Sequence, residues 1–217
     1  DYFQLVPFMA LYLQERCNAE TFPNEEILPS AQVLLLYFIY NGTVEITTSQ
    51  ASKELGLTPT SISRASRQLE KLGLIQTMKT GKQKIIHSDS SPKELFERTQ
   101  QKLLNPVKKT VYIPKTCVTS ELLESGYFAL AHYTMLNVPQ IKCFATDSIS
   151  RWKDVMTNNL LDSENQMAVE MWRYNPHLLS KEDKVDELSL ALSLRDDADE
   201  RVEAAVDEML EKLWGKI

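Results

Sequence analysis

Arginine, lysine and hydroxyl side chains recur at helical spacing between residues 58 and 73. Arg64 and Arg67 are three positions apart, so on a helix they would lie one turn apart on the same side. An α-helix fits the major groove of DNA, and an arginine can donate two hydrogen bonds to O6 and N7 of guanine. The two arginines therefore predict a helix that recognises DNA bases by hydrogen bonds to their edges. The further candidate contacts to bases or phosphates on this helix are Thr58, Thr60, Ser61, Ser63, Gln68 and Lys71.

The segment around these arginines is basic, although the chain as a whole is acidic. Residues 48–87 contain seven basic and two acidic side chains, a net charge of +5, while the 217-residue chain has a formal net charge of −6. A local excess of positive charge on an acidic background predicts contact with a polyanion such as double-stranded DNA. Two alternatives stay open: the cations only keep a helix face solvated, or the segment contacts protein and no DNA.

Two helices are expected before the one that carries the arginines. The stretch "PSAQVLLLYFIYNG" predicts a largely buried helix that begins at Pro29 and ends at Asn41 and Gly42, because its apolar positions are too dense for a surface helix. The stretch "TTSQASKELG" predicts a short helix capped by Thr48 or Ser49 that ends at Gly56. Both helices would support the next one.

The arginine-bearing helix and a hairpin complete this unit. Thr58 is the expected N-cap, and Pro59 suits the first helical position because its missing N–H has no partner there in any case. The expected buried positions are Ile62, Ala65, Leu69 and Leu72. "LIQTMK" and "KQKIIHS" predict two strands around a turn at Thr80 and Gly81. The lysines of this hairpin, which we expect on the DNA backbone or in the minor groove, are Lys79, Lys82 and Lys84.

The stretch "SKELGLTPTSISRASRQLEKLGLI" resembles MarR-type and related bacterial winged helix-turn-helix regulators. The positions that match the family pattern are Ser52, Leu55, Gly56, Leu57, Ile62, Leu69, Gly73, Leu74 and Ile75. The chain departs from the pattern in having Ser52 where alanine is usual and in a short wing without the common Asp/Arg pattern. The resemblance implies a cytoplasmic transcriptional regulator that acts as a repressor and binds double-stranded DNA as a homodimer. A dimer would place two recognition helices in successive major grooves.

We expect two domains, at residues 1–104 and 105–217. The first would hold the winged helix-turn-helix with an N-terminal helix from Tyr2 to Leu13 and a linker helix over residues 91–104. The N-terminal helix is apolar nearly all round, so it must pack against a dimer partner or against its own chain. The second would be a small α+β domain for dimerisation, sensing of an effector or partner binding. Its expected elements are strands at 107–114, 140–146 and 166–176, a helix over 119–136 and two C-terminal amphipathic helices.

The sequence holds no motif for a catalytic nucleophile, a metal ion or a cofactor. We therefore expect no enzyme activity, no catalytic residue, no metal site and no cofactor. The three cysteines are widely spaced, which favours buried thiols, and the longest apolar run is too short for a membrane span. The stretch "SGYFALAHYTML" loosely resembles the C-terminal domains of abortive-infection antitoxins. An antitoxin-like protein that represses its own gene and binds a toxin, and a winged-helix scaffold that binds only protein, are the alternative functions.

Overall fold

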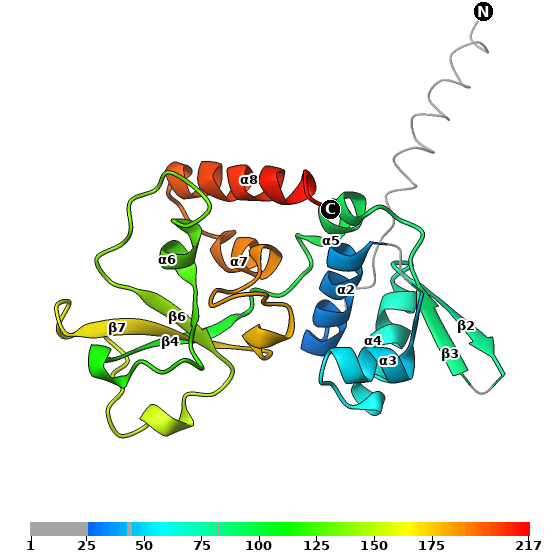
Figure 1. Ribbon diagram of the computed structural model, residues 1–217, viewed down its shortest axis with the longest axis horizontal. Coiled ribbons are helices and arrows are strands. Elements are labelled where there is room, and N and C mark those ends of the chain that lie inside the picture. The colour runs from blue at the N-terminus through cyan, green and yellow to red at the C-terminus, as the bar shows by residue number, and fades with distance from the viewer. Residues whose placement is uncertain (1–25, 43–44, 82) are drawn as a thin grey trace, which may run out of the picture.

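The chain has a mixed α+β architecture with two separate sheets and more helix than strand (Figure 1). The computed structural model describes residues 26–42, 45–81 and 83–217. The helix expected from Tyr2 to Leu13, Cys17 and the hairpin residue Lys82 lie outside these described residues. The α+β class agrees with the class predicted from the sequence.

Helix α2 (Pro29–Asn41) forms the centre of the N-terminal half. Its buried residues, which surround the helix, are Ala31, Gln32, Val33, Leu34, Leu35, Leu36, Phe38 and Ile39. Pro29 occupies the start, where a missing N–H costs no hydrogen bond, and Gly42 ends the helix with a positive φ of 70°. The predicted bounds of this helix are confirmed.

A short strand and a short helix follow α2. Strand β1 (Ile46–Thr47) leads into α3 (Thr48–Glu54). The hydroxyl of Thr47 accepts the Gln50 N–H at 3.2 Å, and the Gln50 side-chain oxygen accepts the Thr47 N–H at 3.0 Å. The prediction of Thr48 or Ser49 as the cap is therefore wrong by one or two positions. Pairing of β1 with β3 holds Thr47 in the extended conformation that a cap requires.

Helix α4 (Pro59–Lys71) and a hairpin complete the N-terminal half. Strands β2 (Gln76–Thr80) and β3 (Gln83–His87) pair antiparallel, and the sheet order is β1-β3-β2. The first predicted strand begins too early, because Leu74 is buried in the turn that leaves α4 and its N–H bonds to the Leu69 carbonyl at 3.0 Å. Helix α5 (Pro92–Thr99), capped by Ser91, then leads toward the C-terminal half.

The C-terminal half is built on a four-stranded sheet. Its strands are β4 (Val107–Pro114), β5 (Leu123–Glu124), β6 (Cys143–Thr146) and β7 (Gln166–Trp172), in the order β4-β7-β6-β5. Strands β6 and β7 are parallel, and the other pairs are antiparallel. In Figure 1 the helices α6 (Gly126–Leu130), α7 (Glu187–Leu194) and α8 (Glu200–Trp214) lie above the sheet. Short 3-10 turns cover Lys115–Cys117, Ser150–Trp152 and Pro176–Leu178.

The helix predicted over residues 119–136 is wrong for most of its length. Leu123 and Glu124 instead form β5, paired with Ala145 and Phe144 of β6, and only Gly126–Leu130 is helical. Gly126 has a φ of 55°, which a continuous helix cannot contain. The predicted amphipathic character of the last two helices also holds only for α8, since α7 is buried from Leu188 to Leu192.

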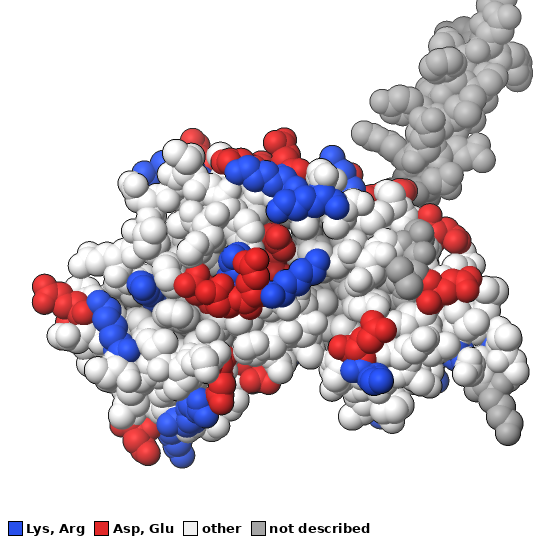
Figure 2. All heavy atoms as spheres, viewed as in Figure 1, with Lys and Arg blue, Asp and Glu red and all other residues white. Residues whose placement is uncertain are grey.

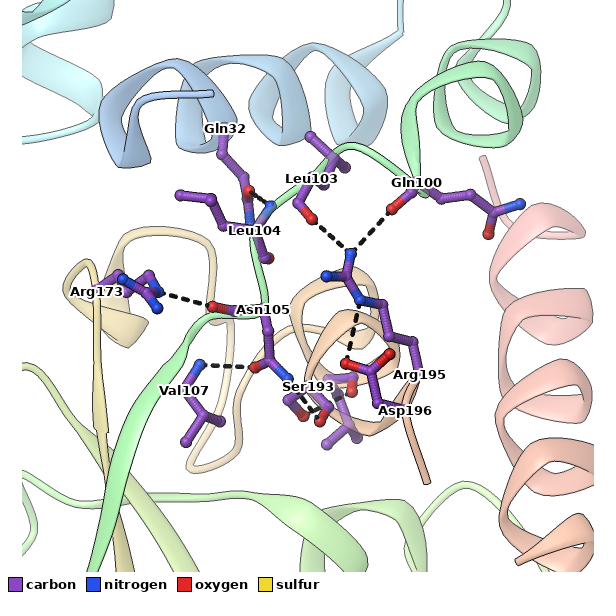
Figure 3. Close-up of polar contacts among 11 residues, drawn as sticks. Gln32, Gln100, Leu103, Leu104, Asn105, Val107, Arg173, Ser193, Arg195 and Asp196 are labelled. Atoms are coloured by element: carbon purple, nitrogen blue, oxygen red, sulfur yellow. Dashed lines mark hydrogen bonds and ion pairs between the residues drawn. The ribbon is translucent and has the colours of Figure 1, made fainter. Parts of the chain in front are cut away.

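Polar contacts, drawn in Figure 3, and a shared hydrophobic core join the two halves. The fully buried Gln32 amide accepts the Leu104 N–H at 2.6 Å and donates to the Leu104 carbonyl at 3.0 Å. Arg195, just after α7, donates to the carbonyls of Gln100 and Leu103. One hydrophobic core runs from Ile27 to Leu213 and includes side chains from both halves. The expected domain boundary after residue 104 falls in this joined segment.

Candidate nucleic-acid interface

Helix α4 presents a polar stripe to solvent on the side opposite its buried face. The buried side chains are Ile62, Ala65, Ser66 and Leu69. The exposed stripe consists of Thr60, Arg64, Arg67 and Lys71, spaced by four, three and four positions. Three of its four members are cationic. The predicted separation of a buried face from a cationic face is thus present in the structure.

The N-terminal end of α4 is fixed by its cap. The Thr58 hydroxyl accepts the Ser61 N–H at 3.1 Å and lies 2.9 Å from the Ser61 hydroxyl. The turn before this helix is closed by the Ser52 hydroxyl, which donates to the Leu57 carbonyl at 2.6 Å, and by Gly56, whose φ is 58°. These local bonds hold α3 and α4 in a fixed relation. Thr58 and Ser61 therefore have structural roles, and Ser63 is only half exposed.

The hairpin brings two lysines to the side of α4. Lys79 lies directly opposite Lys84 on neighbouring antiparallel strands, so both side chains share one face of the hairpin. The same face carries Thr77, whose hydroxyl donates to Glu70 of α4. The Lys84 ammonium donates to the Ser66 hydroxyl at 3.2 Å. Ser66 belongs to the buried face of α4, so Lys84 contacts this helix on a different side from the exposed stripe.

The carboxylates of α3 and α4 have hydrogen-bond partners other than the arginines. Glu54 accepts the Tyr37 hydroxyl, and Glu70 accepts the Thr77 hydroxyl. Burial and the neighbouring Glu54 raise the pKa of Tyr37 to about 12. Within the described part of the chain, no hydrogen bond or ion pair engages the guanidinium groups of Arg64 and Arg67. Both arginines are available to an anionic ligand.

Gln68 differs from the other predicted contact residues. Its side-chain oxygen accepts the Leu28 N–H, and its side-chain nitrogen donates to the Glu26 carbonyl, each at 2.8 Å. The amide thus holds the chain that enters α2 and has little capacity left for a base. Sequence reasoning missed this role because the two partners are about forty residues away in the chain. The structure describes no side-chain position for Lys82.

Three titratable side chains of the C-terminal half, Glu170, His132 and Glu124, have partners within the chain. Glu170 accepts hydrogen bonds from Ser125 at 2.6 Å and from Trp172 at 3.0 Å, and His132 lies 2.7 Å from Glu124. Cys143 is half-buried and free, and burial together with Glu170 raises the pKa of its thiol. Among the described residues, no group of three or more His, Cys, Asp or Glu side chains is arranged to hold a metal ion.

Comparison with known proteins identifies no relative: no family model, no curated protein and no solved structure matches this chain. None of the helices in the described ranges has the length and apolar character needed to cross a membrane.

Proposed function

We propose that the protein is a sequence-specific, double-stranded DNA-binding transcriptional regulator of the winged helix-turn-helix type. The observation that carries this proposal is the exposed stripe on α4, in which Arg64 and Arg67 have no partner among the described residues. An α-helix fits the major groove, and an unpaired arginine on its surface can donate two hydrogen bonds to a guanine there. Repression is the direction that the resemblance to MarR-type proteins implies.

In the proposed complex, α4 lies in the major groove and the hairpin lies on the backbone. Arg64 and Arg67 read base edges, while Thr60 and Lys71 contact bases or phosphates at the ends of the stripe. Lys79 binds phosphate and adds affinity without sequence information. Gln68 is not among the residues that contact bases, because its amide is bonded to the backbone at residues 26 and 28. The proposed functional unit is a cytoplasmic homodimer, which would bind two half-sites one helical turn apart.

The test replaces each reading arginine separately. A preferred duplex is first selected from a random library with the wild-type protein, and affinity is then measured for this duplex and for a random one. Arg64→Ala and Arg67→Ala should each weaken binding to the selected duplex by roughly tenfold to a hundredfold, which corresponds to about 1–3 kcal/mol per bidentate contact. Binding to the random duplex should fall much less, because there each arginine makes at most a phosphate contact.

The matched control is Lys153→Ala, which removes an exposed cation from the C-terminal half. It should leave both affinities unchanged. Equal losses on the selected and the random duplex in the arginine variants would contradict base reading by α4. Failure of the wild-type protein to enrich any duplex would contradict the proposed function itself and favour a module that binds protein.

A further inference from the structure

The exposed stripe on α4 is rich in hydrogen-bond donors and poor in acceptors. Its members are Thr60, Arg64, Arg67 and Lys71. Guanidinium and ammonium groups only donate, so three of these four side chains bond only to acceptors. In Figure 2, acidic and basic side chains lie side by side on the face of the molecule that is shown, whereas the stripe contains three cations and no carboxylate. The stripe therefore suits a ligand that presents acceptors.

Guanine is the base that best matches such donors. In the major groove guanine presents two acceptors, O6 and N7, whereas adenine presents one acceptor and one donor. Cytosine presents a donor, and thymine presents one acceptor beside a methyl group. Arg64 and Arg67 have no partner among the described residues, so their N–H groups are available to O6 and N7. Each arginine therefore selects guanine over the other three bases.

The side chains of α4 that could recognise adenine or cytosine are already engaged. Adenine is recognised by the amide of Asn or Gln, and Gln68 carries the one side-chain amide of α4. Both ends of this amide bond to the backbone of residues 26 and 28 at 2.8 Å. Cytosine is recognised by a carboxylate, and Glu70 carries the one carboxylate of α4. Glu70 accepts the Thr77 hydroxyl from β2, so it faces the hairpin.

The spacing of the two arginines sets the distance between the guanines that they reach. An α-helix rises about 1.5 Å per residue, so Arg64 and Arg67 are offset by about 4.5 Å along the helix axis. Successive base pairs are about 3.4 Å apart. The two guanines should therefore lie one or two base-pair steps apart. At the ends of the stripe, Thr60 adds a single hydroxyl or methyl contact, and Lys71 bonds to guanine or phosphate.

From this arrangement we infer that recognition of bases by hydrogen bonds from α4 is confined to guanine. Each half-site contains two guanines one or two base-pair steps apart, one bound by Arg64 and the other by Arg67. Adenine and cytosine receive no pair of hydrogen bonds from this helix. The inference rests on the proposed function and goes beyond it by naming the bases.

The test uses the duplex that the full chain enriches from a random library. Each guanine of the half-sites is replaced in turn by 7-deazaguanine, which lacks N7 but still pairs with cytosine. At two guanines of each half-site this change should weaken binding roughly tenfold or more, because a hydrogen bond from a charged group is lost. The matched control replaces each adenine by 7-deazaadenine, which lacks the same ring nitrogen. This control should leave the affinity unchanged.

The arginine variants then assign each guanine. In Arg64→Ala, 7-deazaguanine at one of the two positions should have no further effect, while the other position keeps its tenfold effect. Arg67→Ala should show the reverse pattern.

Three results would overturn the inference while leaving the proposed function intact. They are an enriched duplex that tolerates 7-deazaguanine at every position, a loss of affinity with 7-deazaadenine, and a loss of sensitivity at the same guanine in both arginine variants. Failure of the wild-type protein to enrich any duplex would instead overturn the proposed function, and the inference with it.

Discussion

Arg64 and Gln68 lie one helical turn apart on α4 but have different chemical surroundings. Arg64 is exposed and has no partner among the described residues. Gln68 is half-buried, and both ends of its amide are bonded to the backbone before α2. Residue type and spacing cannot separate these cases, because the partners of Gln68 come from a distant part of the chain. The pattern thus predicted the cationic stripe on α4 but not which polar residues beside it are already engaged.

Replacing Gln68 should therefore affect stability and not DNA reading. Gln68→Ala should lower the free energy of unfolding by about 1–2 kcal/mol, because two hydrogen bonds are lost and the backbone groups at residues 26 and 28 lose their partner. Chemical denaturation measures this loss, with the exposed Gln83→Ala as control. The opposite result would show that Gln68 contacts bases: the variant would be as stable as the wild type and would lose affinity only for the selected duplex.

Helices whose ends are marked by capping residues, Pro or Gly could be predicted from the sequence. Strands that form only by pairing with a distant segment could not. Helices α2 and α4 begin at Pro after a capping position and are followed by Gly or a Gly-containing turn, and their predicted positions are confirmed. Strand β5 could not be predicted, because its two residues are apolar and acidic helix formers that pair with β6 about twenty residues later. The same applies to β1, which exists only through its pairing with β3.

The β2–β3 hairpin should contribute affinity but little specificity. Lys79→Ala should reduce the salt dependence of DNA binding by about one unit of slope, equally on selected and random duplexes, because one phosphate contact is lost. The measurement is binding across a salt series, with Lys153→Ala as the control. An unchanged slope would remove Lys79 from the interface.

Gly126 should be essential for the junction of β5 with α6. Gly126→Ala should destabilise the protein by about 1–2 kcal/mol or more, because its φ of 55° is unfavourable for any residue with a Cβ. The added Cβ would also lie 3.3 Å from Cys143 Cβ and Sγ. Gly215→Ala is the matched control, since its φ is −75° and its new Cβ has no neighbour closer than 3.7 Å. Equal stability of the two variants in thermal or chemical unfolding would contradict this role.

At the scale of the whole molecule, the two halves share a core and a set of buried polar contacts. Gln32 of α2 bonds to Leu104 in the connecting segment and to the Tyr174 hydroxyl at 3.3 Å. Trp214 of α8 packs against Phe96 of α5, with ring centres 5.7 Å apart. These contacts join elements on both sides of the expected domain boundary, so the halves should unfold together.

Two spectroscopic probes can test this cooperativity. The three tryptophans, Trp152, Trp172 and Trp214, all lie in the C-terminal half, whereas circular dichroism reports helices of both halves. The two denaturation curves should coincide. Gln32→Ala should move both curves to lower denaturant by the same amount. The free energy of unfolding should fall by about 1–3 kcal/mol, because the substitution leaves buried backbone groups of Leu104 unpaired. The exposed Gln101→Ala serves as control. Separate transitions for the two probes would contradict a single cooperative unit.

Binding of the purified wild-type protein to duplex DNA across a salt series shows whether α4 reads DNA. We expect tight binding to a selected duplex, weaker binding to a random duplex, and affinities that fall steeply on both as salt increases. Absence of binding to any duplex at low salt, or equal affinity for selected and random duplexes, would contradict DNA reading by α4.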